Sequence, residues 1–452
     1  MTPPGSDRRP PILMRLRWSR DDREIWRLAW PALSALVAEP LYVLADTAIV
    51  GRIGTPQLGG LALAASILLT AHAMFIFLAY GTTAAVARLL GAGEHRRAAH
   101  QAVQSLWLAL AAGVVLAVAG LLLSSWLVNT LGGDDPEVLR NALVYLRISL
   151  LGLPAMLVVL AGVGYLRGVQ DTKRPFAVAL GSAVGNFVLE VVLVYGFDQG
   201  IGASALSTVI AQTAAAAAFV WWTRQAVARH GVGLRPDPAV IRRLAIAGWD
   251  LLIRTSALRV SLTITVAVAA RIGTDDLAAH QIVFEVWTVL ALVLDAVAIA
   301  GQALIGLALG AGRPDRARAL GRRMIGWGLA SGVMTGVVVL ALSGVLPHVF
   351  TEDAAVVALA AFLLLHVGFS QPAAGVVFAL DGVLIGAGDL RFLAVSMVGA
   401  GVVLVGGGLV VVAVSAGIGW LWAALHAWMG TRLALMLWRF ASPAWQITGA
   451  DR

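Results

Sequence analysis

Carboxylates occur at helical spacing inside segments that are otherwise apolar. In EPLYVLADTAIVG, which begins at residue 39, Glu39, Tyr42 and Asp46 occupy positions i, i+3 and i+7. This spacing places the three side chains on one face of a helix. Because a charge in membrane hydrocarbon costs about 2.5 to 3.5 kcal/mol on insertion scales, we expect this face to line a cavity or contact another helix rather than lipid. The alternative for Asp46 is a position near the outer end of a span, where a carboxylate is tolerated.

A second polar pair stands in GNFVLEVVLVYG, where Asn186 and Glu190 lie one helical turn apart. Carboxylate and amide oxygens in a low-dielectric pocket can bind one small cation. That cation could be Na⁺, or a proton retained by a carboxylate beside a second carboxylate. The alternative is an amide and a carboxylate bonded between helices only to hold the bundle together.

The second half of the chain has carboxylates of its own in apolar runs. Glu285 and Asp295 lie roughly 80° apart around one helix, so both could face a substrate cavity. Asp381, in VFALDGVLIGAGD, either contributes to the cavity or stabilises a helix end. Asp250 and Arg254 are one turn apart, and we expect them to form a structural ion pair.

Pro31 lies inside the first apolar run, in LAWPAL. A proline within a helix removes one backbone hydrogen bond and favours a bend. The bend could be static, or it could be a hinge that moves the face bearing Asp46.

The composition of the whole chain explains where such residues must lie. Of 452 residues, 59% are hydrophobic and 13% are charged, and the mean hydropathy is +0.85. These values indicate a polytopic membrane protein. The sequence has no cysteine, no GK[ST] phosphate loop, no HExxH and no GxSxG, which argues against thiol chemistry, ATP hydrolysis, metalloenzymes and serine hydrolases. We therefore expect no enzyme activity and no cofactor other than a coupling ion.

Twelve apolar runs are each long enough to cross a membrane as a helix. They cover residues 28–50, 58–85, 103–127, 143–164, 176–196, 201–223, 245–269, 277–306, 324–346, 357–385, 393–415 and 418–438. The predicted fold class is therefore an all-α membrane protein with twelve transmembrane helices.

The distribution of basic residues predicts how these helices are oriented. With the N-terminus inside, 26 of the 33 Arg and Lys residues fall in the tails and the even-numbered connections. Both termini should then be cytoplasmic. Leaflet orientation also explains the net charge of +8 without a nucleic-acid partner.

The two halves of the chain repeat one another. RIGT at Arg52 and Arg271, and GAG at Gly91 and Gly310, are each separated by 219 residues. The repeat indicates two six-helix lobes around a pseudo-two-fold axis normal to the membrane, with a cavity between them. The predicted domains are an N-terminal tail (1–27), a first lobe (28–225), a cytoplasmic linker (226–244), a second lobe (245–438) and a C-terminal tail (439–452). We expect the N-terminal tail to be disordered.

The polar residues Asp46, Asn186 and Glu190 have no carboxylate or amide counterparts in the second half of the repeat. An offset of 218 or 219 residues places Thr265 opposite Asp46, Leu404 opposite Asn186 and Gly408 opposite Glu190. A purely structural role would more often have been kept in both copies, so this asymmetry favours a functional site in the first lobe.

Four segments of the sequence resemble the multidrug and toxic compound extrusion (MATE) transporters, specifically the DinF branch. They are WPALSALVAEPLYVLADTAIVGRIGTPQLGGLAL, RIGTDDLAAHQI, LDAVAIAGQALIGLALGAG and LDGVLIGAGDLRFL, and the resemblance covers about residues 25–435. It implies an inner-membrane antiporter that expels cationic or amphipathic organic compounds in exchange for inward H⁺ or Na⁺. It also implies that Asp46, Asn186, Glu190 and Thr208 bind the coupling cation and that bending at Pro31 accompanies substrate release.

Glu190 departs from the branch, which usually has aspartate at this position. The longer side chain argues against a tight sodium cage and favours proton coupling. Glu39 would favour cationic substrates. We expect a monomer whose partners are small organic compounds and membrane lipids. The main alternative is a lipid-linked precursor flippase of the same superfamily, which should have cationic residues in its cavity. A major-facilitator transporter and a membrane-embedded transferase are less compatible with the motifs.

Overall fold

Every regular element in the described part of the chain is a helix. The structure is a computed structural model that describes residues 19–196 and 200–450, without the side chain of Glu39. The helices are α1 (Arg20–Gly51), α2 (Thr55–Phe75), α3 (Phe77–Gly91), α4 (His95–Leu131), α5 (Pro136–Leu150), α6 (Leu153–Gly168), α7 (Lys173–Val191), η1 (Val192–Gly196), α8 (Gly200–His230), α9 (Pro238–Ile272), α10 (Thr274–Gly310), α11 (Pro314–Leu342), η2 (Leu346–Val349), α12 (Ala354–Gly386), α13 (Leu390–Ala413) and α14 (Ile418–Ala441).

These helices account for the twelve predicted spans. Helices α2 and α3 together form the second span, and α5 and α6 form the fourth with a bend of 51° between them. By length and composition, ten segments of the described chain could cross a membrane, or eleven with the bent pair. The remaining span is α14, whose four tryptophans and two arginines lower its hydropathy. It packs against α12 and α13 like its neighbours. The predicted twelve-helix fold in two lobes is therefore confirmed.

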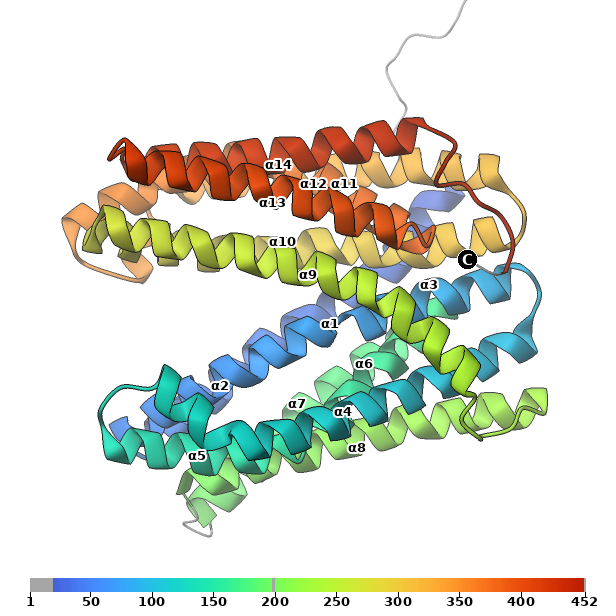
Figure 1. Ribbon diagram of the computed structural model, residues 1–452, viewed down its shortest axis with the longest axis horizontal. Coiled ribbons are helices and arrows are strands. Elements are labelled where there is room, and N and C mark those ends of the chain that lie inside the picture. Colours follow the sequence, from blue (N-terminus) through green and yellow to red (C-terminus); the bar gives the residue numbers. More distant parts are fainter. Residues whose placement is uncertain (1–18, 197–199, 451–452) are drawn as a thin grey trace, which may run out of the picture.

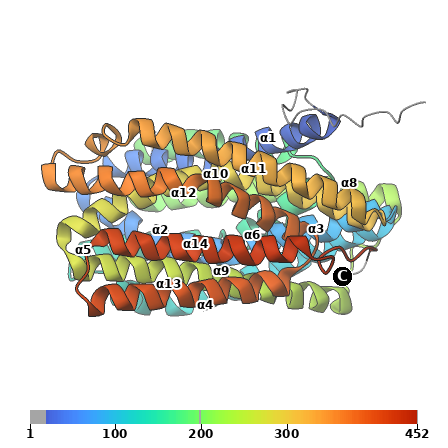
Figure 2. The same cartoon turned by 90° about the horizontal axis from the view of Figure 1, so that it is seen from above.

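The two lobes correspond to the two halves of the chain. In Figure 1, α10 to α14 lie above and α2 to α8 lie below. In the second lobe, α9 and α13 pack together along one side and α10, α11 and α12 along the other (Figure 2). The first helix of each lobe also reaches across, because α1 contacts α10 and α11 while α9 contacts α3 and α4.

The lobes diverge at one end and meet at the other (Figure 1). At the end where they meet, the repeated GAG motifs face each other. A Cβ atom added to Gly91 would lie 2.1 Å from the Leu307 carbonyl oxygen, and one added to Gly310 would lie 2.0 Å from the Arg88 carbonyl oxygen. The duplicated glycines thus permit the ends of α3 and α10 to touch. We call this region the convergent end.

The segment after α14 packs onto the convergent end. The Trp445 side chain is buried and stacks on Phe440 at 5.3 Å between ring centroids. The Arg88 guanidinium donates hydrogen bonds to the carbonyl oxygens of Ala387, at 2.8 Å, and Gly449, at 3.2 Å. The predicted C-terminal tail therefore joins the two lobes.

Helix α1 begins at Arg20, before the predicted lobe boundary at residue 28, so residues 20–27 of the predicted N-terminal tail are helical. Ser19 and Asp22 form a capping box, which satisfies backbone N–H groups at the start of the helix. Residues 1–18 lie outside the described part. Both α8 and α9 extend into the predicted linker (226–244), and residues 231–237 separate the two helices.

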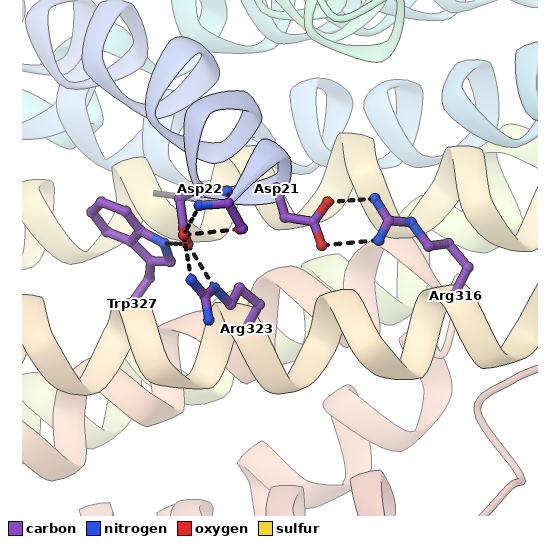
Figure 3. A network of polar contacts seen from close by, with 6 residues as sticks. Asp21, Asp22, Arg316, Arg323 and Trp327 are labelled. Carbon is purple, nitrogen blue, oxygen red and sulfur yellow. Dashed lines mark hydrogen bonds and ion pairs between the residues drawn. The ribbon is translucent and has the colours of Figure 1, made fainter. Parts of the chain in front are cut away.

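Ion pairs hold the first turns of α1 against α11 of the other lobe (Figure 3). Two nitrogens of Arg316 donate to the Asp21 carboxylate at 2.6 and 2.9 Å. The Asp22 carboxylate accepts from Arg323 at 2.6 Å and from the Trp327 indole at 2.8 Å. We call these contacts the α1 anchor. Residues 20–27 are helical because these long-range partners accompany the local cap.

Candidate cation and substrate site

A cavity of about 330 Å³ lies among the helices of the first lobe and reaches α10 of the second. Its wall is mainly apolar, with a few polar side chains that converge on it. The polar and charged residues that the argument uses are Tyr42, Asp46, Tyr80, Tyr145, Arg167, Asn186, Thr208 and Asp295. An apolar pocket with convergent polar groups is the usual form of a small-molecule site.

Asp46 is buried in the wall of this cavity and is held by two hydroxyl donors. The Ser204 hydroxyl on α8 donates to Asp46 Oδ1 at 2.7 Å. The Tyr145 hydroxyl on α5 donates to Asp46 Oδ2 at 3.2 Å. The carboxylate is therefore buried inside the lobe, although Asp46 lies in the last two turns of α1.

Glu190 lies behind Asp46 and is completely buried. Its carboxylate is within hydrogen-bonding reach of Asp46, yet both of its oxygens lack a donor among the described residues. The Asn186 side-chain oxygen, also buried, lacks a donor as well. Buried acceptors without partners are costly. Two carboxylates can bond to each other only when a proton or another cation lies between them, so this pair fits a cation site.

Thr208 and Tyr42 complete the polar surface around Asp46. The Tyr42 hydroxyl and Thr208 Oγ1 are 2.7 Å apart. Thr208 Oγ1 also lies 3.2 Å from the carbonyl oxygen of Ser204, the residue that bonds Asp46. The structure thus brings Tyr42, Asp46, Asn186 and Thr208 to one cavity, with Glu190 directly behind it.

The candidates from the second lobe separate into different environments. Asp295 lines the cavity and accepts a hydrogen bond from the Tyr80 hydroxyl at 3.2 Å. Glu285 is exposed on α10 and does not line this cavity. The side chain of Glu39 lies outside the described part of the structure, so the prediction for it stays a prediction.

Asp381 is buried between two arginines and does not line the cavity. It accepts hydrogen bonds from Arg254 at 2.7 Å and from Arg432 at 2.8 Å. The predicted pair between Asp250 and Arg254 is therefore wrong. Arg254 faces α12, where a buried carboxylate needs a counter-charge, whereas Asp250 lines a second pocket at the convergent end. The structure gives Asp381 the role of an ion-pair centre.

The repeat-related positions of the second lobe hold no carboxylate. Thr265, opposite Asp46, is buried and lies 3.2 Å from His280 Nε2. Leu404 and Gly408, opposite Asn186 and Glu190, are both buried. The first lobe alone therefore has the pair of facing carboxylates.

Four residues of the site were missed by sequence reasoning. Ser204 stands one turn before Thr208, so the polar stripe on α8 could have revealed it. Tyr80 and Tyr145 gave no signal beyond being tyrosines in apolar runs. Arg167 was counted as a loop residue because the apolar run ends at 164, but it lies within α6 with 7% of its surface exposed.

Comparisons with known proteins agree on one family. The MatE family model matches residues 31–192 and 252–407. Protein DETOXIFICATION 44, chloroplastic, of Arabidopsis thaliana is 32% identical over 432 residues, which are 93% of this chain and 82% of that protein. DNA damage-inducible protein F of Escherichia coli (strain K12) is 31% identical over 295 residues, 64% of either chain.

Solved structures agree on the fold. A multidrug resistance MATE family transporter in an outward-facing conformation superposes with a TM-score of 0.84 at 20% identity, over 94% of this chain and 96% of that one. A MOP superfamily transporter from Pyrococcus furiosus gives a TM-score of 0.84 at 19% identity over the same shares.

Proposed function

Since the chain belongs to the MatE family of membrane transporters, as its motifs predict, we propose that it is a secondary antiporter. It exports amphipathic organic compounds from the cell in exchange for inward H⁺. The facing carboxylates of Asp46 and Glu190 carry this proposal. They lie beside a cavity that can take a small organic molecule, and their contact requires a cation.

The arrangement around Asp46 favours a proton over Na⁺ as the coupling ion. Both oxygens of Asp46 accept hydrogen bonds from hydroxyl groups, which occupy about two of the four lone-pair sites of the carboxylate and fix its orientation. A single proton between Asp46 and Glu190 would remove the repulsion and give each carboxylate a partner. Substrate entering beside Asp46 and a proton on the pair would then compete, and this competition couples the two movements.

Alternating access follows from the two lobes. The positive-inside rule places the convergent end, which holds the Arg-rich connections, in the cytoplasm. Both termini are then cytoplasmic, the chain lies in the cell inner membrane, and the cavity opens outward in this conformation. Pro31 lies between the α1 anchor and the face of α1 that holds Tyr42 and Asp46, so a bend there would move the cation site relative to the second lobe.

The flippase alternative has little support in the cavity. A pyrophosphate would need several cations. Among the described lining residues, Arg167 is the one arginine, and it is accompanied by Asp46 and Asp295. A monomer surrounded by membrane lipid is sufficient for the proposed cycle, because each part of the site comes from one chain.

Exchange by the purified full-length chain in liposomes tests the proposal. The liposomes are prepared with an acidic interior, and the dye rhodamine 123 is added outside. Antiport should then produce dye uptake coupled to proton efflux. Asp46→Asn should reduce coupled exchange by on the order of tenfold or more, because an amide cannot release the proton. Glu285→Gln is the control, since Glu285 is an exposed carboxylate of α10 that does not line the cavity. Undiminished proton flux in Asp46→Asn would reject the assignment.

A further inference from the structure

Arg167 is a buried cation that the coupling mechanism does not use. It stands in the last turn of α6, and its side chain lines the cavity. Its Nε atom is buried without a hydrogen-bond partner, and among the described residues no carboxylate forms an ion pair with it. The guanidinium therefore faces the space that a substrate would occupy.

Each of the other buried arginines in the described ranges donates at least one hydrogen bond, although the Nε atoms of Arg254 and Arg432 also lack a partner. Arg254 and Arg432 share the carboxylate of Asp381, and Arg88 donates to backbone carbonyls at the convergent end. Among the arginines that are buried in the described ranges, Arg167 is thus the exception. A buried guanidinium without a directly bonded partner is expensive to maintain, so a structural role alone is a poor explanation for it.

Asp295, which also lines the cavity, interacts electrostatically with Arg167, but no ion pair joins the two side chains among the described residues. The hydrogen bond to Asp295 comes from the Tyr80 hydroxyl. The cavity therefore presents a guanidinium that has no direct bond to Asp295, and a carboxylate that is already bonded to Tyr80. A planar guanidinium with free donors matches a carboxylate or another oxyanion through two parallel hydrogen bonds.

We infer that the cavity accepts amphipathic compounds that carry an acidic group, and that Arg167 binds this group while a cationic part of the same molecule faces Asp295. The preferred substrates are then zwitterionic rather than purely cationic. This inference rests on the proposed function, since it assumes that the cavity is the substrate site.

A matched pair of dyes tests the inference by equilibrium binding. Rhodamine 110 has a free carboxylate, and rhodamine 123 is its methyl ester, so the two differ only in the acidic group. Fluorescence polarisation with the purified full-length chain in detergent should give tighter binding of rhodamine 110. Arg167→Gln should weaken binding of rhodamine 110 about tenfold and change binding of rhodamine 123 by less than about twofold, as expected for the loss of a charge-assisted hydrogen bond.

Two further variants make the result specific. Arg167→Lys keeps the charge but loses the bidentate geometry, so it should retain part of the preference for the acid. Arg259→Gln removes an exposed arginine of α9 outside the cavity and should leave both affinities unchanged. If Arg167→Gln weakens the binding of both dyes equally, or weakens the binding of neither, the inference is overturned. Intact binding with absent exchange in liposomes would instead reject the antiporter proposal and leave the role of Arg167 standing.

Discussion

The length of the Glu190 side chain decides how the two facing carboxylates are used. Glutamate brings its oxygens within bonding reach of Asp46, so one proton can link the pair. Shortening the side chain by one methylene moves that carboxylate by more than about 1 Å and opens a space that neighbouring oxygens could share with a metal ion.

We therefore expect Glu190→Asp to change the ion dependence of transport. The parent protein should respond to a proton gradient and should be insensitive to Na⁺ at constant pH. The variant should exchange more slowly with protons and should acquire stimulation by Na⁺. Dye exchange in liposomes with imposed Na⁺ or proton gradients measures both effects, and Glu285→Gln again serves as control. Sodium stimulation already present in the parent would contradict proton coupling.

The predicted residues that the structure brings to one cavity are those whose sequence signal was local. Tyr42 and Asp46 follow from helical phase, and Asn186 from its spacing to Glu190. The failures involve partners far apart in the chain. The distance between Arg254 and Asp381 is 127 residues, and no helical spacing could have linked them. Arg167 was missed because hydropathy alone defined the end of its helix.

At the scale of elements, α1 connects the two lobes. Its first turns are bonded to α11 through the α1 anchor (Figure 3), and its later turns hold Tyr42 and Asp46 in the first lobe. The start of α1 was in principle visible in SRDD, which has the spacing of a capping box. The ion pairs to Arg316 and Arg323 were not visible, because their partners are about 300 residues away in the chain.

A double-mutant cycle measures the α1 anchor. Asp22→Asn and Arg323→Gln should each lower the midpoint of thermal unfolding in detergent, because Asp22 is buried and each change leaves the other partner without its charge. The unfolding free energy of the double variant should fall by less than the sum of the decreases in the two single variants. The difference, which is the coupling free energy between Asp22 and Arg323, should be about 0.5 to 3 kcal/mol. Arg318→Gln, on the same helix but bonded to the C-terminal segment, should combine additively with Asp22→Asn. Additive effects for Asp22 and Arg323 would show that the pair does not hold α1.

Pro31 lies between the anchored turns and the cation site, within a helix that continues on both sides of it. Pro31→Ala restores a backbone hydrogen bond, which should stabilise the local helical conformation of α1 by up to about 3 kcal/mol and make the helix stiffer. We expect a higher unfolding temperature, unchanged dye binding and slower exchange in liposomes. Pro40→Ala, in the same helix beyond the anchored turns, is the comparison. If both variants slow exchange equally, Pro31 has no special role as a hinge.

At the scale of the whole molecule, the duplication made the architecture predictable. Twelve apolar runs and motifs repeated at 219 residues indicate two parallel lobes, and the structure has them. The relative position of the lobes could not be predicted, because it depends on contacts between them. The repeated glycines were visible in the sequence, but their role in bringing α3 and α10 together is apparent only in the structure.

These glycines provide a direct test of the outward-facing arrangement. A Cβ atom at Gly91 would lie 2.1 Å from the Leu307 carbonyl oxygen and 2.9 Å from the Ala311 backbone nitrogen, so Gly91→Ala cannot fit while the convergent end stays closed. The variant should shift the population toward an inward-open state. Because the chain has no cysteine, Ala179→Cys, in the cavity wall, introduces a single reporter for a membrane-impermeant maleimide.

In the parent background, Ala179→Cys should react when the reagent is added outside the cell. In Gly91→Ala, outside labelling should fall severalfold and labelling from the cytoplasmic face of inverted vesicles should rise. Gly326→Ala adds a methyl group where nothing lies within 4 Å, and it should leave the pattern unchanged. If Gly91→Ala folds normally and still labels from outside, the contact between α3 and α10 does not control which side the cavity faces. A reversed pattern in the parent would place the convergent end outside the cell and would contradict the orientation derived from the basic residues.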